Sequence, residues 1–181
     1  WSSDVCSSDL ALKMRYPIVL QHSEEDCGAA SIATIAKHYG RTFAISRVRE
    51  AVGTGSRGTT LLGLSRGAEV LGFNSRQVKA TDQIIDRINE VPLPAIIHWK
   101  GYHWVVLYGK KRKKYVIADP GVGVRYLTRR ELIEGWGNGI MLLLTPDDSR
   151  FYEQQNDKVG GFGRFIARVW PYRFIDRKSV V

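Results

Sequence analysis

The stretch QHSEEDCGAASIATIAKHYG, residues 21–40, decides how the rest of the chain is interpreted. Its first residues are polar, the next are small, and the last are apolar with helical spacing, which predicts a helix over residues 28–39 that ends at Gly40. Cys27 stands where this helix begins. The first N–H groups of a helix lack partners within the helix, and the helix dipole adds partial positive charge, so both favour a thiolate. Cys27 is therefore a candidate nucleophile, although a lone cysteine is more often a buried core residue.

Gln21 and the small residues after Cys27 also fit an active site. A glutamine six residues upstream can return to the same pocket and donate its side-chain amide to an oxyanion. The alternative is that Gln21 ends a strand and bonds only to backbone. Gly28 and Ala29 are small enough to let a second chain come close.

The composition suggests one globular domain with flanking segments, since 44% of the 181 residues are hydrophobic and 25% are charged. The net charge of +9 invites a nucleic-acid function. However, the run KKRKK at residues 110–114 lies in a predicted turn and most other basic residues are scattered. A solvent-exposed loop is therefore favoured over contact with nucleic acid or phospholipid. Cys6 and Cys27 are the only cysteines, which favours a reducing compartment over a disulfide framework.

The chain is predicted to have three parts. Residues 1–14 include neither the basic start nor the apolar run of a signal peptide, and they are interpreted as a disordered tail or an assembly artefact. Residues 15–146 form the folded domain. Residues 147–181 begin with linker composition and continue as a basic amphipathic segment. Such a segment suits a membrane surface on the way to a transmembrane domain, or a helix packed on its own domain. No run of about 18 apolar residues occurs, so no spanning segment is expected.

The periodicity of the apolar residues changes near the middle of the chain. In the first half it predicts a short edge strand followed by helices, and in the second half strands joined by two short helices. Helices first and an antiparallel sheet second define an α+β fold. The expected helices cover residues 28–39, 46–52, 59–71, 82–89 and 128–135, and the expected strands cover 16–20, 73–80, 95–99, 103–108, 115–119 and 140–144.

The predicted hairpin around residues 110–112 brings His103 and Asp119 together. If Gly109 pairs with Lys113, the two residues lie directly opposite each other on one face, with Cβ atoms about 4.5–5.5 Å apart. An even-length loop would shift the register by one residue and place them on opposite faces, so the prediction depends on an odd-length turn. A carboxylate beside an imidazole fixes its tautomer and stabilises the imidazolium, which is the role of the third member of a catalytic triad.

The other histidines are weaker candidates. His38 lies late in the predicted first helix and His22 lies in a loop, whereas His98 has no matched carboxylate. A zinc site at Cys27 and His103 lacks the CxxC or HxxxH spacing that such sites use, so no metal is expected.

Together these motifs resemble those of the bacteriocin-processing cysteine peptidase family, whose members are cytosolic N-terminal domains of peptidase-containing ABC transporters. The resemblance covers residues 16–146 and rests on Gln21 before Cys27–Ala30, on Gly101–Val106 and on Asp119–Pro120. It implies a papain-like fold, in which an N-terminal helical half carries the nucleophile and packs on an antiparallel sheet. By this resemblance Cys27 is the nucleophile and Gln21 lines the oxyanion hole.

The resemblance also assigns the remaining catalytic roles, with His103 as the base and Asp119 as the residue that orients it. The family cuts leader peptides after a pair of glycines, which carry no side chains and therefore pass through a narrow slot. Gly28, Ala29 and Ala30 are expected to form the floor of this slot and Trp104 a wall, although core packing explains Trp104 equally well. An amphipathic leader helix would need an apolar groove. Three leucines are nevertheless expected to belong to the core: Leu61, Leu64 and Leu71.

The implied partners are a precursor peptide with a Gly-Gly leader, the transmembrane and ATP-binding domains of the same transporter, and a second copy in a homodimeric transporter. The peptidase domain itself needs no cofactor. ATP and Mg²⁺ are expected only at the ATP-binding domain, and G-x-x-x-x-G-K-[ST] does not occur in this sequence. The expected location is the cytoplasmic face of the bacterial inner (plasma) membrane.

Other functions compete with that of a leader endopeptidase. A docking domain that binds export substrates without cutting them has no need for Cys27, His103 and Asp119. A papain-like amidase or transglutaminase for small molecules leaves the Gln21 motif unexplained. Nucleic-acid binding rests on net charge alone.

Overall fold

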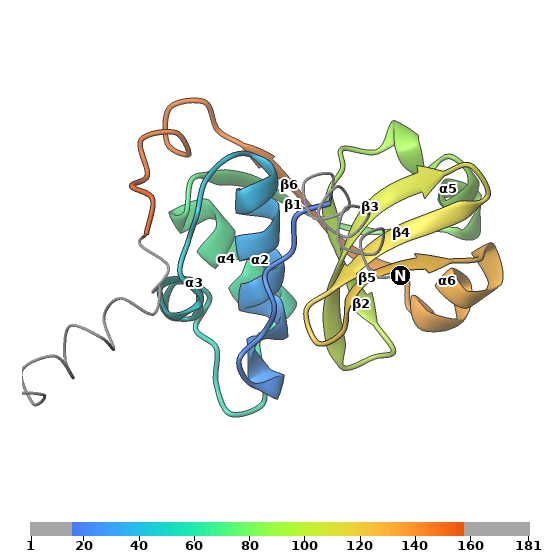
Figure 1. Ribbon diagram of the computed structural model, residues 1–181, viewed down its shortest axis with the longest axis horizontal. Coiled ribbons are helices and arrows are strands. Elements are labelled where there is room, and N and C mark those ends of the chain that lie inside the picture. Colours follow the sequence, from blue (N-terminus) through green and yellow to red (C-terminus); the bar gives the residue numbers. More distant parts are fainter. Residues whose placement is uncertain (1–15, 158–181) are drawn as a thin grey trace, which may run out of the picture.

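Figure 1 shows the computed structural model of the chain, in which residues 16–157 are described and form a helical half beside a sheet half. The expectations for residues 1–14 and for the amphipathic segment after residue 157 lie outside the described residues. No helix within residues 16–157 combines the length and the apolar character needed to cross a lipid bilayer.

The helical half is built around α2 (Cys27–His38), which follows a short 3₁₀ turn, η1 (Glu24–Asp26). Every residue of α2 as far as Ala36 is buried, because α3 (Ile45–Val52), α4 (Leu61–Val70) and strand β3 (His103–Lys111) pack against it. Its glycine, alanine and serine residues are small enough to permit this close packing. The predicted helix is confirmed, and it starts at the cysteine itself.

The sheet half is one antiparallel sheet of six strands in the order β1-β6-β2-β3-β4-β5, so the predicted α+β class is confirmed. The edge strand β5 is not predicted from the sequence, because its residues are mostly half-buried and lack an apolar alternation. The strands are β1 (Phe73–Lys79), β2 (Ala95–Trp99), β3 (His103–Lys111), β4 (Lys114–Asp119), β5 (Gly123–Leu127) and β6 (Ile140–Pro146), and the helices on this side are α5 (Asp82–Asp86), η2 (Ile88–Glu90) and α6 (Arg129–Gly135).

The sheet separates two apolar cores. The first lies between the sheet and helices α2 to α4 and contains Ile32 and Phe73. The second lies on the opposite face, where Trp99 packs with Leu132 of α6. The expectation that three leucines are core residues is confirmed, since all belong to the first core or pack against it: Leu61, Leu64 and Leu71.

The residues before Gln21 pair with no strand of the described sheet, so the edge strand predicted over residues 16–20 is wrong. They run along α2 instead, where the backbone N–H of Val19 donates to Thr34 Oγ1 at 2.9 Å. A short apolar run is equally able to cover a helix or to extend a sheet. Here it covers the helix and delivers Gln21 to the end of β4.

Residues 147–157 pack on the helical half, although their polar composition predicts a linker. Phe151 is fully buried, and its ring centroid lies 4.6 Å from that of Phe73. The backbone N–H of Asp157 donates to the carbonyl of Thr42 at 2.8 Å. A single buried aromatic residue anchors this polar segment, so the packed unit continues to Asp157.

The hairpin between β3 and β4 closes with an even-length turn, so the odd-length turn predicted from the sequence is wrong. Lys111 pairs with Lys114, and only the two residues between them form the turn. Arg112 has a positive φ of 55°, as tight hairpin turns of this length require. By itself this register would place His103 and Asp119 on opposite faces.

A β-bulge in β3 brings His103 and Asp119 back to the same face of the sheet. Tyr108 is the extra residue, because the ladder shifts by one position between Leu107 and Gly109, which has a φ of 116°. When the register above the bulge is continued, Asp119 lies diagonally across from His103 on the same face. The even turn and the bulge together give the proximity that an odd turn alone was expected to give.

Candidate active site

Cys27 begins α2 and is almost fully buried, with 4% of its surface exposed. The turn before it is fixed by Asp26, whose carboxylate accepts from the Ser23 N–H at 3.2 Å and pairs with Arg49 of α3 at 2.9 Å. This buried carboxylate keeps η1 in line with α2, so the sulfur is held at the start of the helix. Cys27 is the one cysteine within residues 16–157, and it is free.

His103 is the first residue of β3, and its imidazole contacts both Cys27 and Asp119. Nε2 lies 2.9 Å from Asp119 Oδ1, and the side chain of Cys27 lies close enough to the same ring to raise its pKa. Because Nε2 faces the carboxylate, Nδ1 is the ring nitrogen left for the sulfur. The three side chains come from α2, β3 and the end of β4, so helix packing and strand pairing bring together residues that are distant in sequence.

Asp119 has further partners besides the imidazole. Its Oδ1 accepts from the backbone N–H of Gly121 at 3.0 Å, and its Oδ2 lies 3.7 Å from Nη1 of Arg125. Arg125 was not predicted as a site residue, because its place beside Asp119 follows from the unpredicted strand β5. The carboxylate is thus held from three directions.

The partners of His103 hold its pKa well above the ordinary value. Burial alone would lower that pKa, but the hydrogen bonds with Asp119 and Cys27 and the negative charge of both outweigh burial and raise it from 6.5 to about 9. Burial raises the pKa of Asp119, but hydrogen bonds from His103 and Gly121 and the charge of Arg125 outweigh it and hold that pKa below 3.8. At neutral pH the pair is therefore an imidazolium and a carboxylate.

Gln21 shares this site. Its backbone N–H donates to the carbonyl of Pro120 at 3.0 Å, which ties Gln21 to the turn that follows Asp119. Its side chain lies against the same turn, since a Cβ on Gly121 would come within 3.6 Å of Gln21 Nε2. Gln21 Oε1 is buried and has no hydrogen-bond partner within residues 16–157.

Two adjoining hollows open at the site, and Glu24 and Tyr102 line both of them. The first hollow, of about 450 Å³, reaches Cys27, and the second, of about 390 Å³, reaches His103. An extended peptide that lies through both hollows therefore passes over the sulfur and the imidazole. The first hollow is also lined by residues 56–59, His98 and Trp104, and the second by Gln21, Asp119, Val122 and Arg125.

Gly28 and Ala29 lie beneath the site and line neither hollow, so the floor expected from them is not found. A Cβ on Gly28 would come within 2.9 Å of Leu64 Cδ2 and 3.2 Å of Thr59 Cβ, so the missing side chain lets α4 and the loop before it approach α2. Trp104, by contrast, lines the first hollow, and its Nε1 donates to the Thr59 carbonyl at 2.9 Å.

His98 lies in the first hollow, although the sequence marks it as a weaker candidate. Its ring centroid is 4.4 Å from that of Trp104, and its Nδ1 is 2.6 Å from Asn138 Nδ2. The available signal was the pairing of β2 with β3, which sets His98 opposite Trp104. His22 and His38 line neither hollow.

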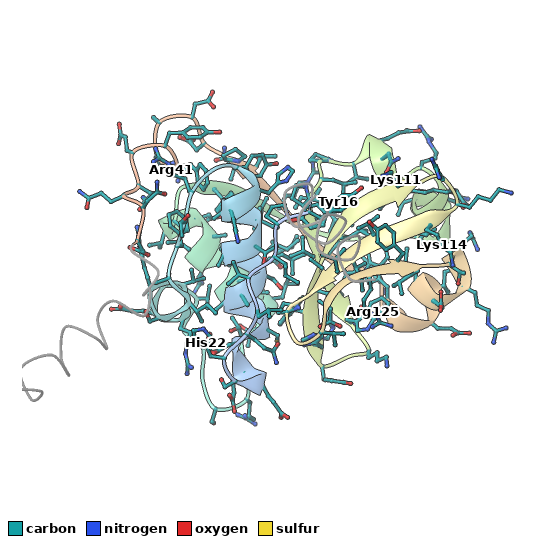
Figure 2. All side chains as sticks on the ribbon, viewed as in Figure 1. Tyr16, His22, Arg41, Lys111, Lys114 and Arg125 are labelled. Atoms are coloured by element: carbon teal, nitrogen blue, oxygen red, sulfur yellow. The ribbon has the colours of Figure 1, made fainter. Side chains whose placement is uncertain are left out.

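The basic run at residues 110–114 forms the tip of the β3–β4 hairpin and is separate from this site. Figure 2 shows Lys111 and Lys114 at the outer end of the sheet half, away from helices α2 to α4. Residues 111–114 are exposed, as expected of a solvent-exposed loop.

In this structure a cysteine at the start of a buried helix faces a histidine and an aspartate from an antiparallel sheet. This arrangement is typical of papain-like cysteine peptidases. The chain belongs to the Peptidase C39 family, whose model matches residues 15–149.

Solved structures place the fold in the same family. The peptidase domain of Streptococcus ComA, a bifunctional ABC transporter involved in a quorum sensing pathway, has a TM-score of 0.68 at 34% identity and covers 73% of this chain and 99% of that one. A double glycine motif protease from an AMS/PCAT transporter, solved in complex with the leader peptide, has a TM-score of 0.67 at 29% identity and covers 72% of this chain and 91% of that one. The predicted papain-like architecture is therefore confirmed.

Curated relatives are processing and transport proteins. The lactococcin-G-processing and transport ATP-binding protein LagD of Lactococcus lactis subsp. lactis is 36% identical over 153 residues, which are 82% of this chain and 21% of LagD. The colicin V secretion/processing ATP-binding protein CvaB of Escherichia coli is 35% identical over 138 residues, which are 76% of this chain and 19% of CvaB. The chain thus spans about a fifth of the length of these relatives.

Proposed function

We propose that the chain is a cysteine peptidase domain that removes double-glycine leaders from bacteriocins or other secreted peptides. The observation that carries the proposal is the contact of one imidazole, His103, with both Cys27 and Asp119 where two hollows adjoin. Further support comes from the similarity to processing and transport proteins and to a double glycine motif protease solved with its leader peptide.

In the proposed reaction the thiolate of Cys27 attacks the carbonyl carbon of the second glycine, so a C–S bond forms and the carbonyl oxygen becomes an oxyanion. His103 gives its proton to the amine nitrogen, the C–N bond breaks and a thioester remains. Neutral His103 then takes a proton from water as the water oxygen attacks the thioester, which releases the leader as a carboxylic acid and frees the Cys27 thiolate. Asp119 stays ionised, keeps the ring oriented and stabilises the imidazolium.

The proposed oxyanion hole consists of the side-chain amide of Gln21 and the backbone N–H of Cys27. Gln21 is anchored at Pro120 beside the imidazole. Cys27 stands at the junction of η1 and α2, where the dipole of α2 adds partial positive charge. Each donor of this kind contributes roughly 10²–10³-fold to kcat.

The chemistry also assigns a direction to the substrate. The leader becomes bonded to the sulfur of Cys27, which lines the first hollow, whereas the leaving amine needs the proton of His103, which lines the second. We therefore place the leader in the first hollow, with Trp104 as its wall, and the released peptide in the second.

The wider setting is proposed from the relatives. The partners would be a precursor peptide with a Gly-Gly leader, the transmembrane and ATP-binding domains of a transporter, and a second copy of that transporter. ATP and Mg²⁺ would act at the ATP-binding domain, because the peptidase chemistry uses only side chains and water. The domain would work at the cytoplasmic face of the bacterial inner membrane.

Cleavage of a synthetic precursor tests the proposal against a docking domain that does not cut. The 181-residue chain is incubated with a peptide in which a leader ending in Gly-Gly precedes a short cargo, and the products are identified by mass spectrometry. We expect one cut after the second glycine and none when both glycines are replaced by valine. Binding of the precursor by fluorescence anisotropy without any cut would favour the docking domain.

A further inference from the structure

We propose that His98 is a substrate-positioning residue, whose Nε2–H donates a hydrogen bond to a backbone carbonyl of the leader in the first hollow. This proposal rests on the proposed function, because it concerns how the peptide lies beside Cys27. His98 belongs to β2 and lines the same hollow as Cys27.

Two contacts fix the ring of His98. Its face packs on Trp104, with ring centroids 4.4 Å apart and planes tilted by 39°. Its Nδ1 lies 2.6 Å from Nδ2 of Asn138, which precedes β6. Trp104 is itself held, since its Nε1 donates to the Thr59 carbonyl at 2.9 Å. The imidazole is therefore preorganised before any peptide arrives.

The hydrogen bonds of Asn138 determine which nitrogen of His98 carries the proton. Asn138 Oδ1 accepts from the backbone N–H of Ile140 at 3.1 Å, so its Nδ2 is the group that faces His98. An amide nitrogen only donates, and His98 Nδ1 must therefore accept. The proton of the neutral ring is then on Nε2, which has no hydrogen-bond partner within residues 16–157 and is not among the buried unpaired atoms.

The ring stays neutral at neutral pH. Burial and the nearby charge of His103 both lower the pKa of His98 below 6.5. A second proton on Nδ1 would also point at the N–H groups of Asn138. His98 is thus a neutral donor with one N–H available to the hollow.

The chemistry of the proposed substrate needs such a donor. Glycine residues offer no side chain for recognition, so a Gly-Gly segment is oriented through its backbone N–H and C=O groups alone. A backbone carbonyl accepts a hydrogen bond from a neutral N–H. The unpaired Nε2–H of His98, which lines the same hollow as Cys27, would give such a carbonyl a defined partner. The oxyanion donors act on the scissile carbonyl, whereas His98 would act on a carbonyl further into the leader.

The test compares His98→Phe with His38→Phe in steady-state cleavage of the Gly-Gly peptide. Phenylalanine keeps the packing on Trp104 and removes the donor. His38 is the matched control, because it also packs on aromatic rings but lines neither hollow. We expect His98→Phe to raise KM roughly 3- to 10-fold with kcat nearly unchanged, and His38→Phe to leave KM unchanged. An unchanged KM, or a fall in kcat alone, in His98→Phe would overturn the proposal.

A measurement on the intact ring covers the case in which His98→Phe does not fold. In Cys27→Ala protein, which is not expected to cut, the ¹⁵N and ¹H resonances of His98 report the tautomer and its partner. We expect protonation at Nε2 and a downfield shift of that proton when the uncut Gly-Gly peptide is added. Protonation at Nδ1, or no response to bound peptide, would refute the role of His98. If the wild-type protein does not cut the peptide at all, the proposed function is refuted. Normal cutting together with these negative results refutes only the proposed role of His98.

Discussion

Asp119→Asn removes one charge from the active site while it keeps the size and shape of the side chain. Asp119 Oδ1 lies 2.9 Å from His103 Nε2, so the imidazolium loses its ionised partner. The amide oxygen of asparagine still accepts from Nε2–H and from the Gly121 N–H. We therefore expect the fold to be kept and part of the peptidase activity to remain.

The size of the expected change in activity follows from the pKa of His103, which is about 9 instead of the ordinary 6.5. At 1.36 kcal/mol for each pKa unit, the protonated ring is stabilised by about 3 kcal/mol. Burial works against this stabilisation, and Cys27 shares in it with Asp119. We expect loss of the Asp119 charge to lower the pKa of His103 by roughly 1–2 units.

The assay is the pH dependence of kcat/KM for a Gly-Gly peptide. In the wild type kcat/KM should fall as pH rises through about 9, because His103 then loses the proton that the leaving amine needs. In Asp119→Asn the fall should come roughly 1–2 pH units lower. Asp86→Asn is the control, since Asp86 is an exposed carboxylate paired with Arg129 at 3.0 Å and lines neither hollow. An alkaline limit that does not move in Asp119→Asn would refute the assigned coupling.

The same pair makes stability depend on pH. A raised pKa in the folded state means that His103 stabilises the fold fully below pH 6.5 and loses that contribution as pH rises through about 9. Asp119, with a lowered pKa, contributes above pH 3.8 and loses its contribution as pH falls below that value. The free energy of unfolding, measured by urea denaturation, should therefore decline from pH 6.5 to about 9, and it should decline less in Asp119→Asn. Equal slopes in the two proteins would contradict this linkage.

Three further substitutions address the oxyanion hole, the packing under the cysteine and the C-terminal part of the packed unit. Gln21→Ala should lower kcat by on the order of 10²-fold or more with little change in KM, and a rise in KM alone would mean that Gln21 only holds substrate. Gly28→Ala should destabilise the fold by about 1–3 kcal/mol in chemical denaturation, since its Cβ would come within 2.9 Å of Leu64 Cδ2, and unchanged stability would show that the packing yields. Phe151→Ala should cost about 3–5 kcal/mol of unfolding free energy, whereas a linker residue would cost almost nothing.

Local signals in the sequence were enough to predict the helices of the helical half and the place of Cys27 at a helix start. The change from polar to small to apolar residues around Cys27 marks a helix start, and helical spacing over the next turns fixes the buried face. The strands that carry His103 and Asp119 also stand out as apolar runs. These features depend on neighbours in the sequence, which is why they were predictable.

Features that depend on distant contacts were not predictable. The bulge at Tyr108 and the even turn at Arg112 depend on the pairing of β3 with β4, and no single residue in the sequence predicts them. Phe151 anchors a segment of linker composition because Phe73 happens to lie opposite, a contact between distant residues. The role of Gly28 likewise follows from the approach of α4, not from the substrate.

The most direct test of the central claim is to trap the thioester on Cys27. The 181-residue chain is mixed with a Gly-Gly precursor, quenched in acid during the first turnover and examined by intact-mass spectrometry and peptide mapping, with Cys6→Ala as the control. We predict an adduct with the mass of the leader acyl group on Cys27, present in Cys6→Ala and absent in Cys27→Ala. Cleavage that persists in Cys27→Ala, or a leader adduct on another residue, would contradict the account.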